Sequence, residues 1–130
     1  MKRILLVALP CVLLLSVAMT HTTALFNWSK TSHDFGRIAQ NKPVTARFAF
    51  VNKGELPLII SSAKGSCGCT GVDYPKAAVL PGQSGEITAT FNAGVAGAFS
   101  KSVTVESNAE TGVQMLSIKG EVVAEPVVAH

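Results

Sequence analysis

The feature that most constrains the fold of this chain is an alternation of apolar and polar residues with a period of two. In the segment 44–51, apolar residues occupy every second position, whereas Thr45 and Arg47 lie between them. Successive side chains of a β-strand point to opposite faces, so the pattern predicts strands with one buried and one exposed face. The segments 87–91, 99–105 and 116–122 repeat it. No long stretch carries apolar residues at helical spacing, and the chain is therefore predicted to be all-β.

Turn signals separate the alternating segments at the intervals typical of a β-sandwich, and they lie at 52–54, 81–82, 92–97 and 107–112. A strand at 35–38, an apolar run at 58–60 that is expected to be covered on both faces, and a short strand near Val72 bring the total to about seven strands. The turns are too short to hold helical crossovers, so neighbouring strands are expected to pair antiparallel. The prediction is an immunoglobulin-like antiparallel β-sandwich.

The N-terminal segment predicts a secretory signal peptide. Lys2 and Arg3 precede an uncharged run over 4–18, which is shorter than the roughly 20 residues needed to span a membrane. Small residues give two candidate cleavage sites, one before Met19 and one before Leu25. The second is preferred because strand-like sequence begins there.

The predicted organisation is therefore a signal peptide at 1–24, one domain at 25–123 and a C-terminal tail at 124–130. The mature protein is expected to be exported, to the periplasm or the cell surface, and not to be an integral membrane protein. The net charge of the chain is +3, and Lys2 and Arg3 supply two of these charges. The nearly neutral mature domain gives no electrostatic case for binding nucleic acid.

The segment Ser66-Cys67-Gly68-Cys69-Thr70 is the one constellation with chemical potential. Loss of the leader removes Cys11, which leaves Cys67 and Cys69 as the only cysteines. An even number of cysteines in an oxidising compartment suggests a disulfide. In an extended strand, however, residues two apart lie roughly 6.6 Å apart with parallel side chains, so their Cβ atoms are well beyond the ~4 Å that a bridge requires. A disulfide would need a tight bend, which the neighbouring glycines permit.

Two functional interpretations of Cys67 and Cys69 stay open beside a purely structural one. Two thiolates on one face suit Cu(I), whereas zinc is disfavoured because His33, Met115 and His130 are remote in sequence. A redox pair or a nucleophilic thiol is the other possibility, and it would need a lowered thiol pKa. His33-Asp34 beside a distant cysteine does not define a catalytic triad, so no catalytic residue and no cofactor are predicted apart from this candidate copper ion. Phe26 and Trp28 are expected to pack across one end of the sandwich.

Several short motifs occur in a characteristic order, namely His33-Asp34-Phe35-Gly36, Phe50-Val51-Asn52-Lys53-Gly54, Pro57-Leu58-Ile59-Ile60, Ser66-Cys67-Gly68-Cys69-Thr70, Pro81-Gly82-Gln83-Ser84-Gly85 and Ile118-Lys119-Gly120. Together they resemble the bacterial domain-of-unknown-function family 1573. That family is similar to the immunoglobulin-like domains of the abnormal-spindle, hydin and major-sperm-protein type. The resemblance implies an exported protein of Gram-negative bacteria and a sandwich fold, but no substrate.

Two functions follow as hypotheses. The first is a non-catalytic binding or structural module of the cell envelope, which would bind an envelope protein or peptide along an exposed edge strand. The last strand, at 114–122, is the expected edge. The second is a copper-binding or thiol-redox protein that uses Cys67 and Cys69.

Overall fold

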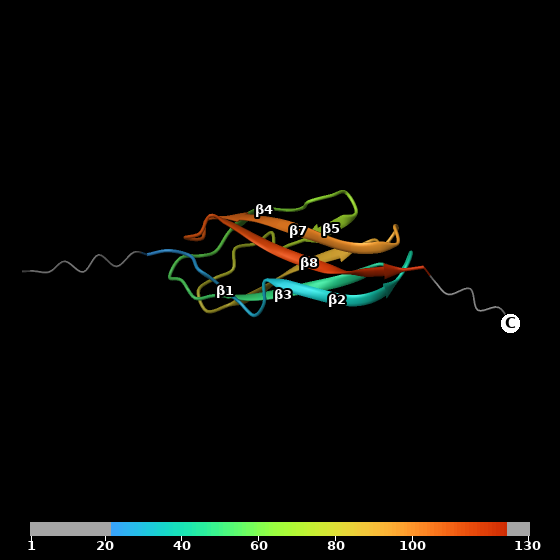
Figure 1. The fold of residues 1–130 in the computed structure, drawn as a ribbon. Coiled ribbons are helices and arrows are strands. Elements are labelled where there is room, and N and C mark those ends of the chain that lie inside the picture. The colour runs from blue at the N-terminus through green and yellow to red at the C-terminus, as the bar shows by residue number, and fades with distance from the viewer. Residues whose placement is uncertain (1–21, 125–130) are drawn as a thin grey trace, which may run out of the picture.

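The computed structural model describes residues 22–124, which form eight β-strands in two layers (Figure 1). The strands are β1 (Phe26–Trp28), β2 (Ser32–Ala39), β3 (Val44–Asn52), β4 (Ile60–Gly65), β5 (Thr70–Asp73), β6 (Ser84–Phe91), β7 (Gly97–Ser107) and β8 (Val113–Val123). One sheet has the order β1-β3-β6-β5 and the other the order β2-β8-β7-β4. The all-β, immunoglobulin-like prediction is confirmed. The strand that the sequence analysis did not anticipate is β1.

The start of the described chain belongs to both sheets. β1 pairs antiparallel with the end of β3, and the chain then crosses to the other layer, where β2 pairs parallel with β8. The expectation that all neighbouring strands pair antiparallel is therefore wrong for this pair. The argument from short turns holds only for strands that are consecutive in the sequence, and β2 and β8 stand at opposite ends of the domain.

The same crossing overturns the predicted edge strand. The segment 114–122 lies in β8, which has β2 on one side and β7 on the other. The edges of this sheet are instead β2 and β4, and those of the other sheet are β1 and β5. Alternation within a strand does not predict its neighbours, so the pairing of the first long strand, β2, with the last, β8, was not predicted.

The core lies between the sheets and consists of the alternating residues predicted to face inward. Phe48, Ile87 and Leu116 are fully buried, and so is Val103. The run at 58–60 is not covered on both faces, because Leu58 and Ile60 are buried while Ile59 is 50% exposed. Alternation thus continues through this apolar run, and β4 has one face toward solvent like the other strands.

Asn52 organises the end of the sandwich at which the described chain begins. Its side chain is fully buried at the end of β3. Its Oδ1 accepts hydrogen bonds from the backbone N–H groups of Leu25 (3.3 Å) and Gly54 (2.9 Å). Its Nδ2 donates to the carbonyls of Leu56 (2.7 Å) and Val79 (2.9 Å). One side chain therefore holds three separate backbone segments together.

Residues just before Leu25 belong to this packed end. Ala24 is 1% exposed, and its carbonyl accepts a hydrogen bond from the Glu110 N–H (3.1 Å). The Thr23 carbonyl accepts from the Glu55 N–H (2.8 Å). The predicted boundary before Leu25 would remove these contacts. The rest of the predicted leader, and all but the first residue of the predicted tail, lie outside the described residues. Within residues 22–124, no helix is long and apolar enough to cross a membrane.

Candidate functional site

The Cys67–Cys69 segment lies at the other end of the sandwich, in the turn between β4 and β5. β4 is an edge of one sheet and β5 an edge of the other, so the turn joins the two layers. Gly65 ends β4 in close contact with Thr70, because a Cβ at Gly65 would lie 2.8 Å from the Thr70 Cβ. Glycine is thus required there by packing, whereas Gly68 lies at the exposed tip with open space around it.

Backbone hydrogen bonds fix both sides of this turn. The Ser66 N–H donates to the Ser102 carbonyl of β7 (2.8 Å), and the Thr70 N–H donates to the Cys67 carbonyl (3.3 Å). The Asn92 N–H donates to the Cys69 carbonyl (3.1 Å). The two cysteines are therefore held by both sheets, and only the tip between them is free of the framework.

In the structure Cys67 and Cys69 form a disulfide, with Cα atoms 5.3 Å apart. The chain bends at Gly68 instead of running extended. This is the tight bend that a disulfide between residues two apart was predicted to need. The two half-buried cysteines have different surroundings. The Cys67 Sγ lies 3.7 Å from the Thr70 hydroxyl, and Thr70 is buried.

Cys69 instead lines a hollow of about 190 Å³. Phe91 and Phe99 form one wall, and their rings stack with centroids 4.1 Å apart. Val95, which is 81% exposed, and Lys101 also line this hollow, the Cys69 hollow. Its lining is mainly apolar with one cation, which is a suitable surface for a side chain of a partner.

The other candidate ligands are not brought to the cysteines. His33 lies on β2, at the edge of its sheet opposite to β4, so the structure separates His33 and Asp34 from the disulfide. Met115 lies on β8, and His130 is outside the described residues. Across residues 22–124, no group of three or more His, Cys, Asp and Glu side chains is placed to hold a metal ion. Burial, and then the Lys30 ammonium, lower the pKa of His33 below 6.5, while Asp34 acts in the opposite direction.

A second region with binding potential is the open edge of β3. β1 covers β3 only at Phe50–Asn52, so residues 44–48 have a strand neighbour only on the β6 side. The Ser29 N–H donates to the Ala49 carbonyl (3.0 Å), whereas the Asn52 N–H points the other way, to Gln83 (2.9 Å). Because backbone groups alternate in an antiparallel strand, those of Thr45 and Arg47 face the open side.

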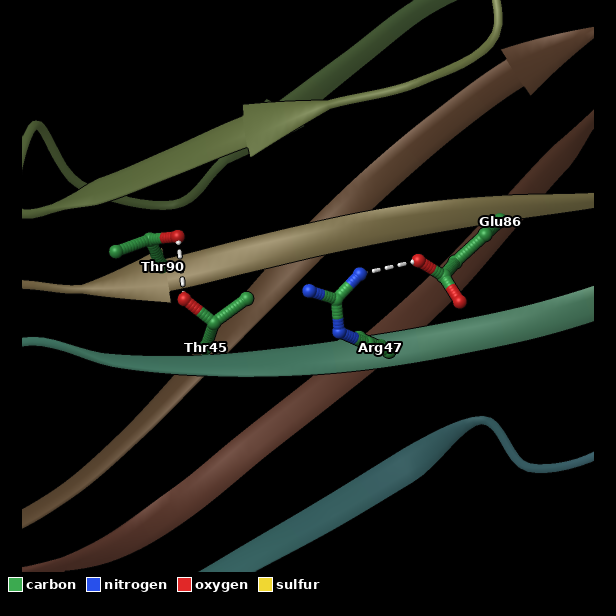
Figure 2. A network of polar contacts seen from close by, with 4 residues as sticks. All are labelled: Thr45, Arg47, Glu86 and Thr90. Carbon is green, nitrogen blue, oxygen red and sulfur yellow. Dashed lines mark hydrogen bonds and ion pairs between the residues drawn. The ribbon is translucent and has the colours of Figure 1, made fainter.

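The side chains of this strand are engaged elsewhere. On the outer face, Arg47 Nη1 contacts Glu86 Oε1 at 2.7 Å, and the Thr45 and Thr90 hydroxyls lie 2.9 Å apart (Figure 2). Both contacts run toward β6 and leave the opposite edge of β3 uncovered. Eight consecutive register pairs with β6 show that β3 is regular over its length.

The other edges carry features that discourage strand addition. β2 has a register shift between Asp34 and Arg37, and Gly36 there has a φ of 67°. β4 has a register shift next to Ile60 and an exposed Lys64. β5 is only four residues long. The regular open edge in residues 22–124 is therefore that of β3.

Residues 26–122 match the family described as "Protein of unknown function (DUF1573)", and the chain belongs to this family. The resemblance inferred from the ordered motifs is thus confirmed. No curated protein sequence matches the chain.

Solved structures share the fold at low sequence identity. A protein of unknown function from Porphyromonas gingivalis W83 has a TM-score of 0.68 and 16% identity over 81% of this chain and 50% of that chain. The ASH/PapD-like domain 7 of human CEP192 has a TM-score of 0.60 and 10% identity over 85% of this chain and 94% of that one. The VesB protease of Vibrio cholerae has a TM-score of 0.61 and 12% identity over 75% of this chain and 32% of that chain. The chain thus spans half of the Porphyromonas protein and a smaller part of the protease, and these likenesses show the fold alone.

The cysteines were found from the sequence, but three features of the two candidate regions were missed. The Cys69 hollow depends on residues 91–101, which are distant from Cys69 in sequence. Thr70 drew attention only as part of the cysteine motif, and its contact with one particular sulfur could not be foreseen. The β3 edge was hidden because the alternation that identifies a strand says nothing about its neighbours.

Proposed function

We propose that this protein is an exported, non-catalytic module of the cell envelope that binds an extended segment of a partner protein along the open edge of β3. The observation that carries the proposal is that pairing of β1 with β3 extends only from Asn52 to Phe50. The regular part of β3 that precedes Phe50 pairs only with β6. An added strand would continue the line of β1 along the same edge. Unpaired backbone groups of an edge strand are a template for such pairing.

The chemistry of this side of the sandwich defines the partner segment. Phe35 and Ile38 of β2 and Val44 of β3 are packed against the core but only partly buried. Every second side chain of an added strand would point inward and cover this apolar surface. The segment is therefore extended, about five residues long at 3.3 Å per residue, and apolar at alternate positions. Polar residues between them would lie beside Thr45 and Arg47 on the outer face.

The test uses a synthetic seven-residue peptide with Val or Ile alternating with Thr. In the protein alone, the Thr45 and Arg47 amides should exchange quickly with solvent, and the peptide should slow their exchange. The same peptide should leave the exchange of amides in β4 and β5 unchanged. Slow exchange of Arg47 in the free protein, or protection at another edge, would overturn the proposal.

Two substitutions at one position separate pairing from surface chemistry. Arg47→Pro removes an N–H group on the open side, whereas Arg47→Ala removes only the ion pair with Glu86 and keeps the N–H group. Both variants should fold, as judged by circular dichroism, because the β6 ladder does not use this N–H group. Only Arg47→Pro should abolish peptide protection and lose the envelope proteins that the unsubstituted protein captures.

A second candidate function is thiol-based, and the proximity of Cys67 and Cys69 favours it. After reduction, the two thiolates would suit Cu(I), which accepts few soft ligands. Intact-mass measurement of the reduced protein with Cu(I) tests this function. One bound copper ion that is lost in the Cys67→Ser, Cys69→Ser double variant would support copper binding, and an unchanged mass would exclude copper binding.

A further inference from the structure

We infer that the Cys67–Cys69 disulfide is a redox site with a fixed direction of thiol exchange. An incoming thiolate attacks Cys69, and Cys67 is the leaving group. The partner is a dithiol, that is, two neighbouring cysteines of another protein. This inference does not depend on strand docking at β3, because it rests on the turn between β4 and β5 and not on the open backbone of β3.

Access distinguishes the two cysteines, because Cys69 lines the Cys69 hollow and Cys67 does not. A thiolate that enters the hollow therefore approaches Cys69 and not Cys67. Lys101 in the lining would attract the negative charge of that thiolate, and the Phe91–Phe99 wall would receive an apolar side chain next to the partner's cysteine.

Thr70 can stabilise Cys67 as the leaving group. When the S–S bond breaks, the sulfur that is not attacked becomes a thiolate. The Thr70 hydroxyl, 3.7 Å from the Cys67 Sγ, can donate a hydrogen bond to that charge. A leaving thiolate of lower pKa departs faster, so this hydroxyl favours departure of Cys67 over departure of Cys69.

The turn that carries the cysteines can keep its backbone hydrogen bonds when the disulfide opens. The Ser66, Thr70 and Asn92 N–H groups hold the turn through backbone bonds that do not involve sulfur. Only one residue separates the cysteines, and Gly68 has open space on its side. The two sulfurs therefore stay close after reduction.

The exchange balances in two steps. A partner thiolate forms a bond to the Cys69 sulfur while the Cys67–Cys69 bond breaks, and Cys67 leaves as a thiolate that takes up a proton. The second partner thiolate then attacks the partner's own sulfur in the mixed disulfide and releases Cys69 as a thiolate, which is also protonated. The partner dithiol is oxidised to a disulfide, and Cys67 and Cys69 are reduced by two electrons.

The decisive experiment locates the mixed disulfide. The oxidised protein is mixed briefly with glutathione, quenched with acid, alkylated with N-ethylmaleimide and sequenced by tandem mass spectrometry. Glutathione should be on Cys69 and the alkyl group on Cys67, with a preference of about tenfold, which corresponds to 1.4 kcal/mol. An even distribution, or glutathione mainly on Cys67, would overturn the assigned direction of thiol exchange. Absence of any mixed disulfide and of any reduction by dithiothreitol would overturn the redox site altogether.

Three variants test the mechanism. Thr70→Val keeps the shape of the side chain but removes the hydroxyl, and it should slow reduction by dithiothreitol about fivefold. Thr70→Ser keeps the hydroxyl and should restore most of the rate. Lys101→Gln should slow attack by glutathione, whereas Lys64→Gln, outside the hollow, should not. If Thr70→Val reacts at the unsubstituted rate with unchanged preference for Cys69, Thr70 has no part in the exchange.

Discussion

The two ends of the sandwich are built on opposite principles. At the end where the described chain starts, the fully buried Asn52 side chain holds separate segments together by hydrogen bonds to their backbone groups. At the other end, Cys67 and Cys69 are joined to each other across a single exposed glycine. The Asn52 side chain links distant parts of the sequence, whereas the disulfide links two positions that the chain already keeps close.

The two ends should therefore differ in how much they contribute to the free energy of unfolding. A buried amide that joins distant segments contributes to the free energy of unfolding, because its loss leaves several buried groups without partners. A bridge across one residue closes almost no loop and so constrains the unfolded chain little. The Asn52 end should therefore govern stability, and the cysteine end should be free to change its redox state.

The largest expected effect is that of Asn52→Leu. The substitution leaves the Leu25 and Gly54 N–H groups and the Leu56 carbonyl without the Asn52 side chain as partner, and the Val79 carbonyl keeps only its bond from the Leu58 N–H. It should lower the free energy of unfolding by about 3 kcal/mol. Urea unfolding would measure it. The matched control is Asn92→Ala at the other end, where Oδ1 accepts only the Gly94 N–H, and a loss below about 1 kcal/mol is expected. Equal losses would remove the contrast between the two ends.

Removal of the residues just before Leu25 should have the next largest effect. A chain that starts at Leu25 lacks the buried Ala24 and the carbonyls that bind Glu55 and Glu110. It should be less stable than a chain that starts at Thr22 by about 2 kcal/mol. For the proposed signal peptide, this expectation favours a cleavage site before Met19 over one before Leu25. N-terminal sequencing of exported protein that begins at Leu25, with undiminished stability, would contradict it.

Loss of the disulfide should have a smaller effect. The Cys67→Ser, Cys69→Ser double variant is expected to lose about 1.5 kcal/mol, since the bridge closes a very short loop. Thermal unfolding of the oxidised protein, the reduced protein and the double variant would show it. A loss of stability as large as that of Asn52→Leu would mean that the disulfide mainly stabilises the fold.

The smallest effect concerns His33, which lies at neither end. Because its pKa is lowered below 6.5 in the folded protein, chiefly by burial, the unfolded chain binds more protons near that pH. Its contribution to stability is present above about pH 6.5 and is lost as the pH falls toward the folded pKa. His33→Gln should flatten the dependence of stability on pH in this range. An unchanged slope would assign the acid sensitivity to the carboxylates.

The sequence predicted those parts of the molecule that depend on local periodicity. Alternation in β3, β6 and β8 correctly identified which side chains are buried, since the strand period fixes the face of each residue. It did not predict which strands neighbour each other, so the parallel β2–β8 pair and the open edge of β3 were missed. At the site, the cysteines were found by composition. Their unequal surroundings depend on Thr70 and on residues 91–101, which only the folded chain brings there.

The crossing of the chain between β1 and β2 has one practical consequence. Trp28, the single tryptophan of the sequence, stands at that crossing, stacks on Phe26 and meets the edge of Phe50. Its indole Nε1 is buried and has no hydrogen-bond acceptor among residues 22–124. Any loosening of the segment that passes from β1 to β2 would bring water to this nitrogen. The fluorescence emission of Trp28 would then shift to the red. The protein thus carries an intrinsic fluorescent reporter of its own opening, without any added label.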